Sequence, residues 1–243
     1  MTTLAPPLAE ERMLAESPQR STPEHPAPVV TYPESDGMPM AENTEQFQWI
    51  VLIKENLEAL FRDDPTVFIA GDLLWYPVQG DNRTRVAPDA MVVFGRPKGK
   101  RGSYKQWEED NRAPQVVFEI LSPGNRAGEM TNKYLFYTRF GVEEYYLYDP
   151  EANTLDGWQR EGTLLIPIEP MDGWVSPRLG IRFDLSGEKL VLYRPDGQPF
   201  LSFTELEQRA EQERTARAQA EQRASEAEQR AEQEHTARLA AEA

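Results

Sequence analysis

The composition of the C-terminal segment constrains this chain most strongly, because such a segment cannot build a core. From Thr204 onward the sequence consists mostly of Glu, Gln, Arg and Ala, with ten glutamates against six arginines. This composition is typical of a solvated helix with ion pairs between successive turns. Residues 204–243 are therefore predicted to form a long helix outside the folded domain.

The same segment contains a repeat. The residues Arg209–Arg217 recur as Arg230–Arg238, with His235 in place of Arg214, at a displacement of 21 residues or three heptads. Alternating steps of four and three residues from Leu206 lead mostly to alanine, interrupted by charges, whereas a strong coiled coil needs Leu, Ile or Val there. A single solvated helix and a weak coiled coil that assembles copies of the chain both remain open.

The N-terminal end is rich in proline. Residues 1–40 hold eight of the 20 prolines and six acidic residues against two arginines, without a helical or strand period. This pattern predicts disorder. Glu10 and Glu11 stand where a secretory signal needs basic and then apolar residues. The folded domain is expected between the two biased ends, at residues 41–203.

Residue types that the domain lacks narrow its chemistry. The chain has no cysteine, which excludes disulfides, thiolate catalysis and zinc held by cysteine. Its two histidines, His25 and His235, lie in the biased ends, which disfavours histidine-ligated zinc and histidine general bases. A site in the domain must then use carboxylates, lysine and a hard cation. The lack of cysteine, and of any apolar run longer than Trp49–Ile53, favours a cytoplasmic protein without membrane spans.

Hydrophobic periodicity in the domain predicts an α/β (or α+β) fold. Apolar residues at helical spacing indicate helices over residues 44–61 and 128–140. Short β-rich runs surround the second helix and span residues 67–70, 73–76, 90–94, 116–121, 144–148, 154–159, 163–168, 179–183 and 190–193. This order predicts a mixed sheet flanked by helices. The tyrosine-rich run 145–148 is interpreted as a core strand in preference to a base-stacking surface.

Two carboxylates interrupt otherwise apolar strands. Asp89 opens the run that ends at Phe94, and Glu119 lies inside Val116–Leu121. A buried charge is costly unless it is paired or binds a metal, so an ion pair at a strand end explains either residue alone. On neighbouring strands the two could instead meet at one divalent cation, as hard oxygen ligands suited to Mg²⁺ or Mn²⁺.

A lysine on the second helix can complete this group. Glu129, Lys133 and Tyr137 follow one another at four-residue intervals and share one helix face. An ordinary surface pair between Glu129 and Lys133 explains the spacing equally well. In the functional interpretation, Lys133 stabilises charge that develops on a phosphate or positions the attacking water.

These motifs together resemble a known family. Four segments carry the likeness: Pro88-Asp89, Glu119-Ile-Leu-Ser-Pro, Glu129-Met-x-x-Lys133-x-x-x-Tyr137 and Phe140-Gly-Val-Glu-Glu-Tyr-Tyr-Leu-Tyr-Asp-Pro150. They are similar to the Uma-two family of putative restriction endonucleases, within the PD-(D/E)XK nuclease superfamily. The resemblance covers about residues 41–195 and is most specific from Glu119 to Pro150. It implies a restriction-endonuclease-like sheet core flanked by helices.

The resemblance also implies roles for individual residues. Asp89 and Glu119, with the backbone carbonyl of Ile120, would hold Mg²⁺ (or Mn²⁺), and Lys133 would assist the reaction. The superfamily places a lysine two positions after the second carboxylate, where this chain has Leu121. Lys133 would therefore act in its place from the following helix.

Two further residues are candidates for accessory roles. Asp72, on an earlier strand, could add a carboxylate to the group, although a capping or solvated role explains it equally well. Tyr137 shares the helix face of Lys133.

The charge of the chain disfavours easy DNA binding. The net charge is −15, whereas a protein that grips DNA through its phosphates needs a basic face. One stretch that leaves the Asp89 strand carries several cations and no acid, and could receive a phosphate backbone beside the metal; a solvated loop is the alternative. These nucleic-acid-binding candidates are Arg96, Lys98, Lys100, Arg101 and Lys105.

The leading hypothesis is a magnesium-dependent endonuclease that hydrolyses DNA phosphodiester bonds. The alternative is a catalytically weak nuclease-fold interaction protein that forms homo-oligomers through its C-terminal helix. The acidic charge and Leu121 favour the alternative. The joint presence of Asp89, Glu119 and Lys133 favours the enzyme.

Overall fold

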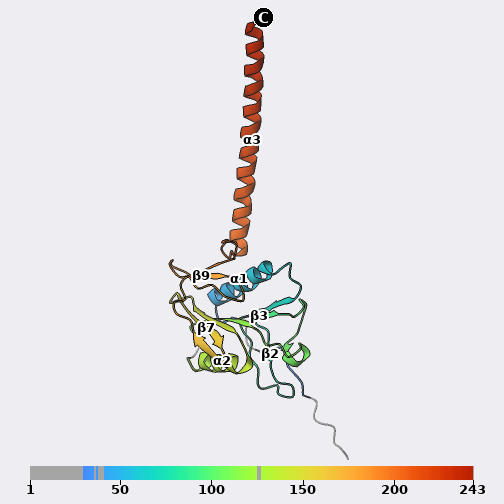
Figure 1. The fold of residues 1–243 in the computed structure, drawn as a ribbon, viewed down its shortest axis with the longest axis vertical. Helices are drawn as coiled ribbons and strands as arrows, with labels where there is room; N and C mark the ends of the chain where they lie inside the picture. The colour runs from blue at the N-terminus through green and yellow to red at the C-terminus, as the bar shows by residue number, and fades with distance from the viewer. Residues whose placement is uncertain (1–29, 36, 38–40, 125–126, 243) are drawn as a thin grey trace, which may run out of the picture. The chain divides into compact units, whose positions relative to one another are not determined.

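A six-stranded mixed sheet forms the centre of the domain (Figure 1). The computed structural model describes residues 30–35, 37, 41–124 and 127–242, except for some side chains within the helices, so most of the segment predicted to be disordered lies outside the described residues. The strand order is β1-β3-β5-β6-β7-β8. The strands are β1 (Val67–Ala70), β3 (Ala90–Phe94), β5 (Val116–Ile120), β6 (Glu144–Asp149), β7 (Thr154–Glu161) and β8 (Leu164–Pro167).

The sheet is antiparallel except at its centre. There β5 and β6 run parallel, and helix α2 (Ala127–Phe140) connects them in a βαβ unit. Two small sheets accompany it: β2 (Trp75–Tyr76) pairs with β4 (Tyr104–Lys105), and β9 (Arg182–Asp184) pairs with β10 (Val191–Tyr193). The predicted α/β class with a mixed sheet is confirmed.

Each face of the sheet packs against a different helix (Figure 1). Alternation along β5 sends Phe118 and Ile120 toward helix α1 (Thr44–Leu60) and Val117 toward α2. The tyrosine-rich strand β6 is buried on both faces, which confirms its interpretation as a core strand. Glu119 follows Val117 in the alternation, so the α2 face receives its side chain.

Helix α1 begins at a side-chain cap. Asn43 is its N-cap, and its Oδ1 accepts a hydrogen bond of 2.8 Å from the backbone N–H of Gln46. Buried residues then recur at helical spacing, from Gln46 through Ile50 and Ile53 to Leu57. The predicted helix is confirmed, and it ends one residue before the expected position.

The two predicted helices of the domain and all nine predicted strand regions occur. Strand β4 and the 3₁₀ turn η1 (Gln106–Glu108) that follows it were not predicted. Strand β4 is two residues long and pairs with an equally short β2. Tyr104 donates its backbone N–H to the carbonyl of Leu74 at 2.7 Å. So short a strand lacks a detectable period, because its place depends on a distant partner.

Some residues upstream of position 41 also contact the domain: the carbonyl of Thr31 accepts a hydrogen bond of 2.8 Å from Asn82 Nδ2. The Tyr32 ring packs against Tyr76 and Trp107, with centroid distances of 5.2 and 4.9 Å. The Tyr76 hydroxyl donates to the carbonyl of Pro33 at 2.7 Å. The segment around Tyr32 therefore covers part of the small β2–β4 sheet.

A third helix, α3 (Phe203–Glu242), occupies the C-terminal segment, as the composition predicts. It begins with a capping box: the Ser202 N–H donates to Glu205 Oε2 at 2.7 Å, and the Glu205 N–H donates to Ser202 Oγ at 3.3 Å. None of the helices in the described parts of the chain is both long and apolar enough to span a membrane.

Arg160 of β7 fastens the C-terminal end of α2. Its guanidinium donates to the carbonyls of Val142 at 2.6 Å, Thr138 at 2.8 Å and Tyr137 at 3.1 Å. We expect Arg160→Met to lower the free energy of unfolding by about 1.5–3 kcal/mol, because buried carbonyls lose a charged donor. Urea denaturation measures this change. The exposed Arg83→Met should leave stability unchanged, and equal values for the two variants would contradict the role of Arg160.

Candidate active site

The two strand carboxylates lie on the α2 face of the sheet. Glu119 is near the end of β5, and Asp89 immediately precedes β3, the neighbouring antiparallel strand. Only 2% of Glu119 and 8% of Asp89 are exposed. Asp89 Oδ2 accepts a hydrogen bond of 2.7 Å from the backbone N–H of Ile120. The sheet thus places both carboxylates beside the same peptide unit.

Helix α2 brings a lysine and a tyrosine to Glu119. Lys133 Nζ lies 2.8 Å from Glu119 Oε2, and the Tyr137 hydroxyl donates a hydrogen bond to Glu119 Oε1. The structure therefore brings together the predicted group of Asp89, Glu119, Lys133 and Tyr137. Lys133 forms its ion pair with Glu119, whereas the surface pair with Glu129 is not observed among the described residues.

Burial and charge shift the pKa values in this group. Burial, and then the negative charge of Glu119, raise the pKa of Asp89 well above its ordinary value. Burial acts to lower the pKa of Lys133, but the charges of Glu119 and Asp89 outweigh it, so this pKa is raised. Burial and Glu119 also raise the pKa of Tyr137, whose hydroxyl stays protonated as a donor. The group thus contains one ammonium, that of Lys133, and two carboxylates.

The donor set fits a hard divalent cation. When Asp89 and Glu119 are both ionised, Lys133 compensates only one of them, so a cation near the pair relieves the remaining repulsion. The carbonyl of Ile120 accepts a hydrogen bond of 2.9 Å from Gln46 Nε2, which leaves it a second lone pair. No cluster of three or more Asp, Glu, His or Cys residues suited to a metal was found in the described part of the chain. Two carboxylates are nevertheless enough for Mg²⁺ when water and substrate phosphate supply the other ligands.

Asp72 lies beside the backbone of Asp89. Its N–H donates to the carbonyl of Pro88 at 3.0 Å, and its φ of 47° is in the left-handed region, which is uncommon for a residue other than glycine. Its charge contributes, as a minor cause after burial and Glu119, to the raised pKa of Asp89. The accessory position predicted for Asp72 is therefore near the group, although its carboxylate does not join a three-acid cluster.

Two residues near the site escaped the sequence analysis. Gln46 reaches Ile120 from α1, and its only signal in the sequence was a polar residue on the inner face of a helix. Tyr145 of β6 packs against Tyr137 with a centroid distance of 5.0 Å, and its buried hydroxyl has no hydrogen-bond partner among the described residues. Burial and then Glu119 raise the pKa of Tyr145.

Two arginines of the basic stretch after β3 form ion pairs with acidic residues that follow it in the chain. Glu109 pairs with Arg96 at 2.8 Å and with Arg101 at 2.6 Å, and Arg96 also contacts Asp110. Burial acts to raise the pKa of Glu109, but the hydrogen bonds from Arg101 and Arg96 outweigh it and lower that pKa. The guanidinium of Arg101 also lies 3.9 Å from the centre of the Phe68 ring. The side chains of these two arginines are engaged in contacts within the domain and are therefore not available to bind a phosphate.

Position separates this stretch from the carboxylates as well. The Arg96 N–H bonds to the carbonyl of Thr66, next to the start of β1, whereas Asp89 lies at the opposite end of β3. Lys98 pairs with Glu58 at 3.1 Å, and Lys105 pairs with Glu108 at 3.4 Å. Lys100 has no ion pair within the described part of the chain. Arg96 and Lys98 therefore lie away from the carboxylates, and a nucleic-acid-binding role for the rest of the stretch stays a prediction.

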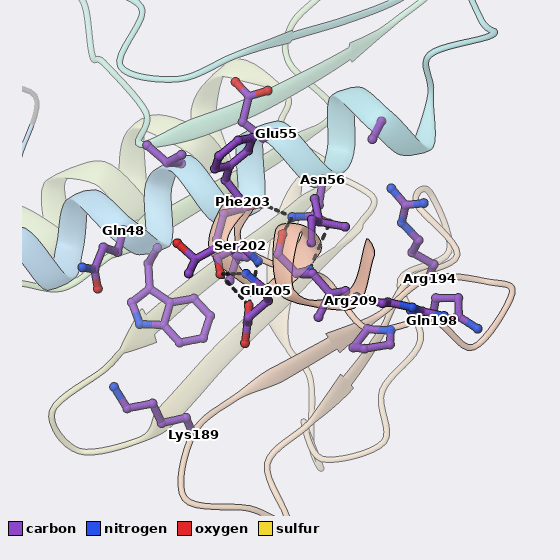
Figure 2. Close-up of a pocket in the computed structure, with 18 of the residues that line it drawn as sticks. Gln48, Glu55, Asn56, Lys189, Arg194, Gln198, Ser202, Phe203, Glu205 and Arg209 are labelled. Atoms are coloured by element: carbon purple, nitrogen blue, oxygen red, sulfur yellow. Dashed lines mark hydrogen bonds between the residues drawn. The ribbon is translucent and has the colours of Figure 1, made fainter. Parts of the chain in front are cut away.

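A pocket of about 930 Å³ lies apart from the carboxylates (Figure 2). Figure 2 shows side chains from α1, such as Glu55 and Asn56, and from the start of α3, such as Phe203 and Glu205, around it. None of the acidic-site residues lines this pocket. The site geometry, with its buried opposing charges, therefore identifies the candidate active site better than cavity size.

A family model agrees with the sequence motifs. Residues 35–192 match the model of the Uma2 family, described as "Putative restriction endonuclease". The chain is also similar to the crystal structure of a putative nuclease belonging to DUF820 from Anabaena variabilis ATCC 29413. That likeness has 16% sequence identity and a TM-score of 0.45, and covers 66% of this chain and 85% of the other. No match was found among curated proteins.

Proposed function

The chain belongs to the Uma2 family of putative restriction endonucleases, and from this premise we propose that it is an endonuclease that hydrolyses DNA phosphodiester bonds with Mg²⁺ or Mn²⁺. One observation carries the proposal: Asp89, Glu119 and Lys133 meet at the ends of β3 and β5, where two buried carboxylates beside a single ammonium are otherwise hard to explain. Burying two carboxylates with one ammonium costs stability, and a binding site justifies such a cost.

Asp89, Glu119 and the Ile120 carbonyl would hold the cation. When bound, the cation supplies Lewis-acid polarisation of the scissile phosphate and of a water. The fixed hydrogen bond from the Ile120 N–H orients one carboxylate, and the Tyr137 hydroxyl orients the other. Both carboxylates are therefore held in place before a ligand arrives, which lowers the cost of ordering them.

Lys133 would stabilise negative charge on the phosphate during bond cleavage. The raised pKa keeps its amine protonated at neutral pH. Only 18% of its side chain is exposed, and in such a setting water weakens the field of the ammonium less than it does at a surface. A charged donor that is held in advance near the reacting group can lower the barrier by several kcal/mol.

Glu119→Gln tests the proposal through metal binding and activity together. We expect the variant to lose at least about tenfold in Mn²⁺ or Mg²⁺ affinity, measured by calorimetry, because a ligand costs no less than an outer-shell partner. It should also lose the ability to nick supercoiled plasmid. The control is Glu129→Gln, which makes the same charge change at an exposed position of α2. Metal binding that is the same in wild type and Glu119→Gln would overturn the proposed site.

The interaction-protein alternative has its own support, because both oxygens of Glu119 already have donors in the structure. It requires that the wild type leave plasmid DNA intact with Mg²⁺ and with Mn²⁺, whether the acidic pair is kept for a structural reason or for residual metal binding. The same pair of measurements therefore separates the two functions. Cleavage by the wild type that Glu119→Gln abolishes would exclude the alternative.

A further inference from the structure

Helix α3 is exposed to solvent wherever its side chains are described. Every described side chain from Phe203 onward is exposed. Within the helix, Arg209 pairs with Glu213 at 3.3 Å and Arg217 pairs with Glu221 at 3.0 Å. Such exposed pairs contribute little individually, so they can exchange partners at small cost.

One stripe of this helix differs from the rest. From Leu206, alternating steps of four and three residues define a seam, which is mostly alanine: Ala210, Ala220, Ala224, Ala227, Ala231 and Ala241. Four charges interrupt it. Glu213 and Arg217 occupy two successive seam positions, and the 21-residue repeat places Glu234 and Arg238 at the equivalent positions further along.

We propose that two copies of the chain pair along this seam with their α3 helices antiparallel. In one register of that pairing, Glu213 lies opposite Arg238 of the second copy, and Arg217 lies opposite its Glu234. All four seam charges of each helix then meet an opposite charge. The two-fold symmetry of the pair makes every such contact occur twice.

The alanines fall into the same register. Ala220 lies opposite Ala231 of the second copy, and Ala224 lies opposite its Ala227, so the central layers contain small residues only. Small side chains permit helix axes to approach to the lower end of the usual 8–10 Å range. Because each alanine layer buries little area, the pair should be weak and depend on protein concentration.

A parallel, in-register pair is disfavoured by the same charges. Glu213 would then face Glu213 of the second copy, and Arg217 would face its Arg217; the second repeat would add two more like-charge layers. Like charges in facing positions destabilise helix pairs, and with alanine between them no large apolar contact offsets the repulsion. The charge pattern therefore selects the orientation.

Apolar side chains are exposed at the start of the seam, which favours burial of this end of α3 by the second copy. Leu206 is 50% exposed and lines the pocket of Figure 2 together with Phe47, which is 46% exposed, and Val51, which is 40% exposed. Grouped exposed apolar side chains are typical of interaction surfaces. In the antiparallel register, Ala241 of the second copy lies opposite Ala210, about one helical turn from Leu206. The second copy would thus reach this apolar end.

Cysteine pairing tests the register directly, because the chain has no cysteine. Ala220→Cys and Ala231→Cys are purified separately and then oxidised alone and mixed. We expect a disulfide-linked dimer mainly in the mixture, since these positions face each other only in the antiparallel pair. The matched control is a mixture of Gln222→Cys and Gln229→Cys, which share the register but lie on the outer face. Linkage of Ala220→Cys with itself as the main product would overturn the orientation.

Charge reversal tests the same pairing in solution. Glu213→Arg should weaken dimerisation of the full chain by about tenfold, because it turns two attractions into repulsions. Adding Arg238→Glu should restore it, whereas in a parallel pair the double variant remains repulsive. Sedimentation velocity over a range of concentrations measures both, with Glu211→Arg as a control off the seam. A wild type that stays monomeric at every concentration, or a double variant without recovery, would overturn the proposal.

Discussion

Replacing Lys133 with methionine is expected to lower the rate of plasmid nicking by about 100- to 1,000-fold, the usual loss when a charged or hydrogen-bonding group that stabilises the transition state is removed. Lys133 is 2.8 Å from Glu119 and is the one cation in direct contact with the described carboxylate pair. Without it, a bound phosphate would lose the charged group proposed to stabilise it. Initial rates of supercoiled-plasmid conversion at saturating Mg²⁺ measure the effect.

The same substitution also affects folding, and this must be separated from catalysis. Glu119 would remain buried without its ion-pair partner, which costs about 3 kcal/mol of unfolding free energy. Lys133→Met combined with Glu119→Gln removes both charges and should regain much of that loss while staying inactive. Lys133→Arg keeps the charge but changes its shape, so it should be stable and only partly active. Full nicking activity in a folded Lys133→Met variant would contradict the assigned role.

Asp89→Asn is expected to have opposite effects on stability and on activity. The raised pKa of Asp89 means that its ionised form is unfavourable in the folded protein. This group therefore favours folding most at low pH, and the contribution is lost as pH rises from the unfolded value of 3.8 through the higher folded value. At pH 7 the neutral amide should raise the free energy of unfolding, because it removes the unfavourable ionised form, and it should abolish nicking.

Urea denaturation at pH 7 and pH 4 checks this prediction, because the gain should shrink at the lower pH. The amide oxygen can still accept the Ile120 N–H, so the geometry is preserved. Asp81→Asn provides a control of opposite sign. Hydrogen bonds, first from the Thr84 side chain and then from the Arg83 backbone, lower the pKa of Asp81, so its substitution should destabilise the fold. A lower stability for Asp89→Asn at pH 7 would contradict the raised pKa.

The fold and the acidic group could be predicted because their signals are local. Strands β3 and β5 are apolar runs, and a single carboxylate stands directly before the first, at Asp89, and within the second, at Glu119. Lys133 and Tyr137 share a helix face at four-residue spacing, so any packing of α2 that brings one to Glu119 also brings the other. Their chemistry follows from residue type, and the proposed roles await the measurements above.

The contacts that the sequence analysis missed join distant segments. Gln46 bonds to Ile120 across 74 residues, and no pattern within α1 specifies that partner. The ion pairs of the basic stretch were missed for a different reason. The acids that neutralise Arg96 and Arg101 are Glu109 and Asp110, which reach them because the chain turns back through β4 and η1. A count of charges along the chain does not reveal such a reversal.

The position of Lys133 on a helix makes the candidate site adjustable. A lysine at position 121, two positions beyond Glu119, would have its distance from the carboxylates fixed by the sheet. That position is occupied by Leu121, which packs into the apolar cluster beneath α2. The carboxylates belong to strands and the ammonium belongs to a helix that Arg160 secures at one end. A small tilt of α2 about that anchor would withdraw or advance the positive charge while the strands stay still. The catalytic strength of such a centre can therefore be tuned by mutations in the packing of one helix, without any change to the metal ligands.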